Sequence, residues 1–166
     1  MAGLEIRPLN ETDDIGELTQ LLHLSYKKLA DEGFRFLATH QDVETTKERI
    51  KKGQCYVAIS ESKIIGTMTY YSPSNTSGNE WYDQASVATY GQFAVSPEFQ
   101  KLGIGGYLIS IAEKTAKFDK AEEITIDTAE GATELIEYYK KRGYRFVGFA
   151  QWEMTNYRSV LLSKKI

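Results

Sequence analysis

Apolar and polar residues recur along this chain with two different periods, which predict where strands and helices form. Alternation with a period of two is typical of a half-buried strand, and apolar positions three and four residues apart are typical of an amphipathic helix. Residues 4–10 alternate and include a proline, which predicts a first strand. Apolar residues then recur at helical spacing over 14–29, with Asp14 in a capping position, so this segment is the first predicted helix.

The middle of the chain predicts a short helix followed by a β-rich block. Asp42 is placed to cap a second helix that ends before Gly53. Two β-rich runs follow at 54–60 and 63–71, separated by a short polar turn, which is the pattern of an antiparallel hairpin. The polar segments on either side of this block are predicted loops, at 30–42 and 72–84.

A strand, a helix and a second strand are predicted after this block. Residues 85–95 form a long β-rich run that ends at a Ser-Pro pair. The apolar positions between Ile104 and Thr115 mark one face of a helix, and residues 122–129 are β-rich again. This β-α-β order predicts two parallel strands joined by a right-handed crossover.

The end of the chain predicts one more helix and two more strands. Basic residues in the last helical turn and Gly143 after it are typical of a helix C-terminus. The apolar face of this helix carries Ala132, Leu135, Ile136 and Tyr139, and the closing strands are expected within 144–150 and 157–166. The order β-α-α-β-β-β-α-β-α-β-β predicts a mixed sheet with helices on both faces, in a single domain over 1–166.

The composition limits the class of protein. The chain has 166 residues, 42% hydrophobic and 26% charged, which is typical of a folded globular protein. A net charge of −3 gives no basic patch for nucleic acid. The one cysteine, Cys55, cannot form an intrachain disulfide, so we expect the protein in a reducing, cytoplasmic setting. Cys55 lies on a predicted strand without basic neighbours, so we expect it in the core. Early charges and the lack of a long apolar run predict no signal peptide and no membrane contact.

A glycine-rich stretch, QKLGIGGYL at 100–108, joins the end of a predicted strand to the start of a predicted helix. Unpaired backbone N–H groups and the positive end of the helix dipole meet at such a position, so the stretch predicts an anion-binding site. Gly103, Gly105 and Gly106 let the backbone approach the bound oxygens closely. The stretch matches neither the dinucleotide-binding fingerprint nor the Walker loop.

Residues Gln100 to Gly105 resemble the Q/R-x-x-G-x-G/A pyrophosphate loop of the GNAT superfamily of N-acetyltransferases. The stretch EYYKKRGY resembles the family's Tyr-x-x-x-Gly-Phe/Tyr signature, with Tyr139 and Gly143 at the two key positions. The Ser-Pro turn before the loop and the order of elements along the whole chain also match. The resemblance implies the GNAT fold, an α/β fold with a mixed (α+β) sheet. The sheet is expected to have six to seven mostly antiparallel strands and helices on both faces.

The resemblance also implies acetyl-CoA as a cosubstrate and an amine acceptor, and it favours a homodimer, while the single cysteine and two isolated histidines predict no metal. The pantetheine arm would lie between two parallel strands that separate after Val95, whose N–H would bond the thioester carbonyl. Lys101 is explained equally well as a contact of the pyrophosphate and as a solvated surface lysine. Ala132 stands where many members of the family carry an asparagine. The residues implied to bind the coenzyme are Phe93, Ala94, Val95, Gln100, Lys101, Leu102, Gly103, Ile104, Gly105, Gly106 and Ala132.

Acetyl transfer needs a proton donor for the leaving thiolate and a neutral amine. The resemblance gives the first role to Tyr139, with the adjacent Tyr138 pointing elsewhere, although an aromatic on an apolar face is also typical of a core. The base is not identified: the strand at 85–95 has no carboxylate, so a water relay or an already neutral amine is as good an explanation. The acids nearest in sequence are Glu80, Asp83 and Glu98.

Aromatic residues in three predicted loops are expected to wall the acceptor site or to cover a core. They are Phe34, Phe36, Trp81, Tyr82, Trp152 and Tyr157. The two histidines, His23 and His40, are isolated and do not suggest a metal site.

The leading hypothesis is an acetyl-CoA-dependent N-acetyltransferase that acts on a primary amine of a small molecule or peptide by direct attack in a ternary complex. One alternative is a catalytically silent CoA-binding sensor or interaction module of the same fold. The other is an interaction domain whose glycine loop is only structural.

Overall fold

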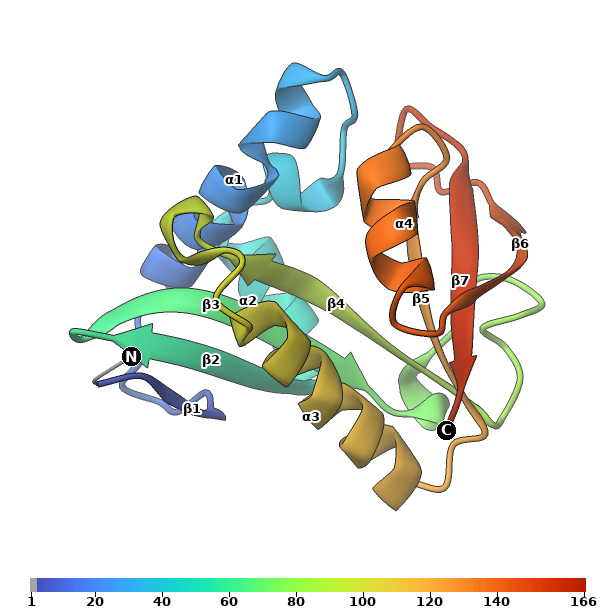
Figure 1. Cartoon of the computed structure of the whole chain (residues 1–166), viewed down its shortest axis with the longest axis horizontal. Helices are drawn as coiled ribbons and strands as arrows, with labels where there is room; N and C mark the ends of the chain where they lie inside the picture. Colours follow the sequence, from blue (N-terminus) through green and yellow to red (C-terminus); the bar gives the residue numbers. More distant parts are fainter. Residues whose placement is uncertain (1–2) are drawn as a thin grey trace.

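The computed structural model describes residues 3–166, whose strands form one seven-stranded sheet (Figure 1). Met1 and Ala2, which the predictions of one domain and of no signal peptide include, lie outside the described residues. The elements are β1 (Glu5–Pro8), α1 (Ile15–Asp31), α2 (Val43–Lys51), β2 (Gln54–Ser60), β3 (Lys63–Tyr71), β4 (Val87–Val95), α3 (Ile104–Phe118), β5 (Glu123–Ala129), α4 (Thr133–Lys140), β6 (Arg145–Ala150) and β7 (Ser159–Lys165).

The predicted order of helices and strands is confirmed, and the predicted caps explain where two helices begin. The Asp14 carboxylate accepts from the N–H groups of Gly16 and Glu17 at the start of α1. The Asp42 carboxylate accepts from the Thr45 N–H at the start of α2. These bonds satisfy N–H groups that have no partner inside the helix. Three short 3₁₀ turns were not predicted, namely η1 (Leu37–Thr39), η2 (Pro73–Asn75) and η3 (Pro97–Phe99).

The sheet is mixed, with the strand order β1-β2-β3-β4-β5-β7-β6. The pairing of β4 with β5 is parallel, and every other neighbouring pair is antiparallel. The predicted parallel pair, joined by the α3 crossover, is therefore confirmed, as is the mixed and mostly antiparallel GNAT-type sheet. Within residues 3–166, no helix has both the length and the apolar character needed to cross a bilayer.

Helices cover both faces of the sheet, and each face has its own core. On one face, Leu108 of α3 and Tyr139 of α4 pack in a cluster with sheet residues such as Ile124. On the other face, Leu18 and Leu22 of α1 pack against β2 and β3. Each fully buried large aliphatic side chain contributes about 1.5–3 kcal/mol relative to an exposed one. These two cores hold β4, the central strand, between α1 and α3.

β4 and β5 pair over only a short part of their length and then diverge. The ladder runs from Val87↔Glu123 to Thr89↔Thr125, and Figure 1 shows the strands separating beyond it, with α1 and α4 on either side. We call this region the splay. An irregularity in the β3–β4 register coincides with Gln92, whose φ is +45°. Such a bulge bends the strand that carries it.

The prediction that these strands separate after Val95 is wrong, because the last paired residue of β4 is Thr89. The bulge at Gln92 turns β4 away from β5 earlier than the sequence pattern indicates. A longer edge of β4, including Phe93 and Val95, therefore lies open to the splay.

Candidate active site

The glycine-rich loop leads into the N-terminus of α3 without a capping side chain. Gly103 is the N-cap residue, with a φ of +87° that favours glycine, and no side chain bonds the first turn. The first N–H groups of a helix have no partner inside it, and the helix dipole makes this end positive. The loop therefore offers free donors and positive charge to an anion, as predicted from the sequence.

Tyr138 of α4 and Arg142, which follows the end of α4, lie close to this loop. A Cβ atom on Gly105 would be 3.2 Å from both the Phe93 ring and the Tyr138 hydroxyl. A Cβ atom on Gly106 would be 2.9 Å from the Arg142 guanidinium, which stacks 4.0 Å above the centre of the Tyr138 ring. Arg142 thus adds a positive charge at the loop, which the sequence interpretation did not foresee.

The free edge of β4 faces the splay. The Ser96 N–H donates to the Ile65 carbonyl of β3 at 2.8 Å. Because neighbouring N–H groups of a strand point to opposite edges, the Val95 N–H points toward the splay. The Val95 carbonyl accepts from Gln100 Nε2 at 3.1 Å, and the Phe93 carbonyl accepts from the Tyr26 hydroxyl at 3.0 Å.

The remaining loop and strand residues have different surroundings. Ala94 is buried in the core beneath α1, so only its backbone can reach the splay. Lys101 and Leu102 are exposed, and Ile104 is buried in the core beneath α3. Ala132 is the N-cap residue of α4 and is buried; it provides a methyl group and no side-chain hydrogen bond.

Tyr139 projects from α4 among other tyrosines beside the splay. Its side chain is 7% exposed, and its hydroxyl makes no hydrogen bond within residues 3–166. Burial raises the pKa of Tyr139 well above its usual value, and the nearby Tyr90 and Tyr26 raise it further. The phenol therefore stays protonated at neutral pH and is able to donate a proton.

Asp127 of β5 also belongs to this site, and the sequence interpretation missed it. It lies just beyond Thr125, the last residue of β5 that pairs with β4. Its carboxylate accepts from Trp152 Nε1 at 2.9 Å and from the Tyr82 hydroxyl at 3.2 Å. Water reaches the residue, but protein atoms crowd it on most sides, and this burial raises the pKa of the carboxyl above its usual value.

Arg49 of α2 approaches the same part of β4 from the α1 side of the sheet. Its Nη1 donates to Gln41 Oε1 at 2.6 Å, and Gln41 Nε2 donates to Gln92 Oε1 at 2.7 Å. A Cβ atom on Gly91 would be 3.4 Å from Arg49 Nη2. The guanidinium is therefore held against the bulge of β4 by a neutral amide.

The aromatic residues from the predicted loops gather in two groups near the splay. Phe36 lies 4.8 Å from Tyr157 and 5.5 Å from Tyr26, between ring centres, and Phe34 lies 6.1 Å from Tyr157. Tyr82 and Trp152 form the second group, 6.2 Å apart. The second group packs with Trp81 in a small core, which agrees with the core-covering alternative for these residues, and the acceptor wall stays a prediction.

Comparison with known proteins agrees with this geometry. The model of the acetyltransferase (GNAT) family matches residues 17–144. The chain belongs to this family. The fold predicted from the resemblance is confirmed, and the protein is an N-acetyltransferase by its family and its curated relatives.

Individual relatives of this GNAT N-acetyltransferase extend over most of its length. It is 32% identical to S-(2-succino)cysteine N-acetyltransferase of Bacillus subtilis over 136 residues, which are 79% of this chain and 78% of the relative. A GNAT acetyltransferase of Elizabethkingia anophelis with bound acetyl-CoA superposes with a TM-score of 0.70, at 21% identity, over 100% of both chains. A Bacillus subtilis acetyltransferase in complex with CoA gives 0.67, at 20% identity, over 98% of this chain and 99% of that one.

The acids that the sequence left as candidate bases lie on exposed loops and turns. Glu80, Asp83 and Glu98 are exposed in loops or turns, and Asp83 accepts the Gly78 N–H. Asp127 is the acid that reaches the splay of this N-acetyltransferase. A signal for it was present: Ile124 and Ile126 alternate with it in the strand and are buried, so a charge at 127 faces the other side.

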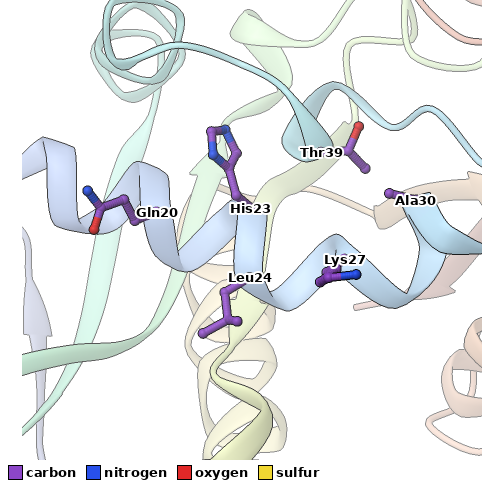
Figure 2. Close-up of a pocket in the computed structure, with 6 residues that line it drawn as sticks. All are labelled: Gln20, His23, Leu24, Lys27, Ala30 and Thr39. Atoms are coloured by element: carbon purple, nitrogen blue, oxygen red, sulfur yellow. The ribbon is translucent and has the colours of Figure 1, made fainter.

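The histidines and the surface hollow beside α1 lie outside the splay. His23 Nε2 lies 2.7 Å from the Gln41 carbonyl, and within residues 3–166 no three potential metal ligands gather together. A hollow of about 420 Å³ beside α1 is lined by Gln20, His23, Leu24, Lys27, Ala30 and Thr39 (Figure 2). None of the predicted site residues lines it. Cys55 is buried, as predicted, and burial raises the pKa of its thiol.

Proposed function

We propose that the protein transfers an acetyl group from acetyl-CoA to a primary amine of a small molecule or peptide, by direct attack within a ternary complex. The observation that carries the proposal is that the glycine-rich loop, the free edge of β4 and the Tyr139 phenol all meet at the splay. The named relative acts on S-(2-succino)cysteine, and this compound is one acceptor to test.

The residues around the splay fit acetyl-CoA in charge and shape. The free N–H groups of residues 101–106 and the Arg142 guanidinium would hold the pyrophosphate, with Gln100 and Lys101 beside it. Glycines at 105 and 106 let Phe93, Tyr138 and Arg142 pack closely against the start of α3. The backbone of residues 93–95 would line the pantetheine arm, with Ala132 giving an apolar contact in place of a hydrogen bond.

The residues assigned to catalysis each serve one part of the transfer. The Val95 N–H would donate to the thioester carbonyl oxygen as negative charge develops there. The amine nitrogen forms the new C–N bond, the C–S bond breaks, and the sulfur leaves with the electron pair. Tyr139 gives its proton to that sulfur and regains one released from the nitrogen as the amide forms. No covalent enzyme intermediate is required.

Asp127 weakens the case for a catalytically silent module. That alternative rested on the lack of a carboxylate in β4, and β5 brings one to the splay. A cytoplasmic location, from the one cysteine, and a homodimer, from the family resemblance, stay predictions.

The test is release of free thiol from acetyl-CoA with a panel of polyamines, amino acids, aminoglycosides, N-terminal peptides and S-(2-succino)cysteine, with a control lacking acceptor. We expect turnover with at least one class and none without acceptor. A rise in melting temperature with CoA but no turnover across the panel would favour the sensor, since a ligand that binds the native state must stabilise it. No rise with millimolar CoA would favour a purely structural loop.

A further inference from the structure

Arg49 has an unused capacity to bind an anion. A guanidinium carries five N–H donors in a planar fork, and within residues 3–166 the polar neighbours of Arg49 are uncharged, namely the Gln41 amide and the Tyr71 phenol. The side chain is half-buried. By contrast, carboxylates pair with Arg7, Arg145 and Arg158. Carboxylate is the anion that matches this fork in two parallel hydrogen bonds.

Asp127 has the complementary capacity to bind a cation. Its two oxygens accept from Trp152 and Tyr82, both uncharged donors, and an ionised carboxylate has about four acceptor sites. Within the described residues no lysine or arginine forms an ion pair with it. Trp152 and Tyr82 fix the orientation of the group and leave an exposed surface for a ligand.

The two charges lie near each other without meeting. The positive charge of Arg49 is close enough to lower the pKa of Asp127, although burial outweighs it and the net shift is upward. Gly91 has no side chain of its own, and the Arg49 guanidinium and the Tyr71 ring lie against this part of β4, 3.4 and 3.6 Å from the position of a Cβ atom. A ligand with one charge of each sign at a short separation would therefore satisfy both groups at once.

We propose that the acceptor is a zwitterionic amino acid or a close derivative, whose carboxylate pairs with Arg49 and whose amino group contacts Asp127. This inference rests on the proposed acetyl transfer and narrows its acceptor. The ammonium first gives one proton to the Asp127 carboxylate, and the resulting neutral amine attacks the thioester. The second proton leaves the nitrogen after attack and replaces the one that Tyr139 gives to sulfur, so one proton is released overall.

The experiment compares matched acceptors on the full chain. Thiol release is measured for L-amino acids, including S-(2-succino)cysteine, and for their carboxamides, with calorimetric binding of the same compounds to the CoA-saturated protein. We expect kcat/KM at least tenfold higher for the acids than for the carboxamides. Arg49→Gln should remove this difference, because it lowers kcat/KM for the acids but not for the carboxamides. Arg49→Lys should keep part of the difference between acids and carboxamides. Lys47→Gln removes a positive charge from the exposed part of α2 and should change kcat/KM neither for the acids nor for the carboxamides.

Asp127→Asn should lower kcat for acids and carboxamides alike and remove the acid limb from the pH profile of kcat/KM. That limb should lie above the ordinary pKa of an aspartate, because activity needs the carboxylate and is lost as pH falls through the raised pKa. Other charged or titratable groups near Asp127 are Arg49 of α2, Tyr26 of α1, Tyr82, Tyr139 of α4 and Tyr157. Burial raises the pKa of each of these tyrosines, so none should titrate in the acid range.

The outcomes separate the two proposals. Equal turnover of acids and carboxamides, unchanged by Arg49→Gln, would overturn the zwitterion inference and leave acetyl transfer standing. Binding of acids that depends on Arg49, without thiol release, would support the inference and overturn the proposed reaction. Neither binding nor turnover for any amine would overturn both.

Discussion

Two adjacent tyrosines of α4 have opposite surroundings. Tyr138 lies under the Arg142 guanidinium and faces Gly105 of the loop. Tyr139 is buried beside Tyr90 and Tyr26, and its hydroxyl has no protein partner within residues 3–166. Within residues 3–166 no protein group engages the Tyr139 hydroxyl, and its oxygen is not among the fully buried polar atoms, which leaves it available to a ligand.

Tyr139→Phe is expected to lower kcat by about 100-fold, because it removes the proton donor for the leaving thiolate. CoA affinity and melting temperature should change little, since the hydroxyl that is lost bonds no protein group. Steady-state kinetics and calorimetry with CoA measure these effects.

The matched control is Tyr138→Phe, which keeps the ring that Arg142 stacks on. It should leave kcat nearly unchanged. An equal fall in kcat for the two variants would mean that packing of α4, rather than proton transfer, explains the loss.

At the scale of elements, the turn from β4 into α3 joins the two functional parts of the site. Gly103 adopts a left-handed conformation that starts the helix, and Gly105 faces Phe93 of the open β4 edge. The N-terminal end of α3 and the strand edge are therefore held at a fixed distance by direct packing. A substitution at Gly105 is therefore expected to affect both the start of α3 and the open edge of β4.

Gly105→Glu is expected to raise the Kd for CoA by about 100-fold or more, because it places a negative charge among the donors that would bind phosphate. A negative charge in the first turn favours the helix, but the new Cβ atom would be 3.2 Å from Phe93 and Tyr138, so some loss of stability is expected as these side chains shift. Binding is measured by calorimetry, and folding by the melting temperature without ligand.

Gly148→Glu makes the same chemical change in β6, where a Cβ atom meets only Leu161 at 3.9 Å, and should bind CoA normally. Near-normal CoA affinity in a folded Gly105→Glu protein would exclude the loop as the pyrophosphate site.

At the scale of the whole molecule, segments far apart in the sequence meet on the open side of the splay. The Asn156 amide accepts from the Arg35 N–H and donates to the Gly33 carbonyl, each at 2.8 Å. Phe36 and Tyr157 pack beside this connection. The loop before β7 is thereby tied to the loop after α1, and both carry aromatic residues of the first group near the splay.

Asn156→Ala is expected to lower the free energy of unfolding by about 1 kcal/mol and to raise the KM of the acceptor several-fold, because the two loops lose their shared hydrogen bonds. The KM for acetyl-CoA should not change. Chemical denaturation and steady-state kinetics check the two effects.

Asn10→Ala is a suitable comparison, since the Asn10 side chain also makes two hydrogen bonds, but its oxygen accepts both of them from Thr12 in the same turn. It should affect stability without affecting the acceptor KM. If Asn156→Ala leaves that KM unchanged, the connection between the loops does not shape the acceptor site.

The sequence by itself determined the features that depend on neighbouring residues. Asp14 and Asp42 cap helices through N–H groups two or three residues away, and Gly103 and Gly143 adopt the left-handed conformation because of their own lack of a side chain. Apolar periodicity predicted the strands and helices, and the motif at 100–106 predicted a glycine-rich turn into a helix N-terminus without a capping side chain.

Only the tertiary structure decided where β4 and β5 part and which side chains meet there. The bulge at Gln92 depends on its partners in β3 and on Gln41, so the pattern of β4 alone placed the separation too late. Arg49 and Asp127 are far apart in the chain and on different elements, and neither belongs to a local motif. They lie near each other because sheet register and helix packing orient them, and those are set by contacts across the whole fold.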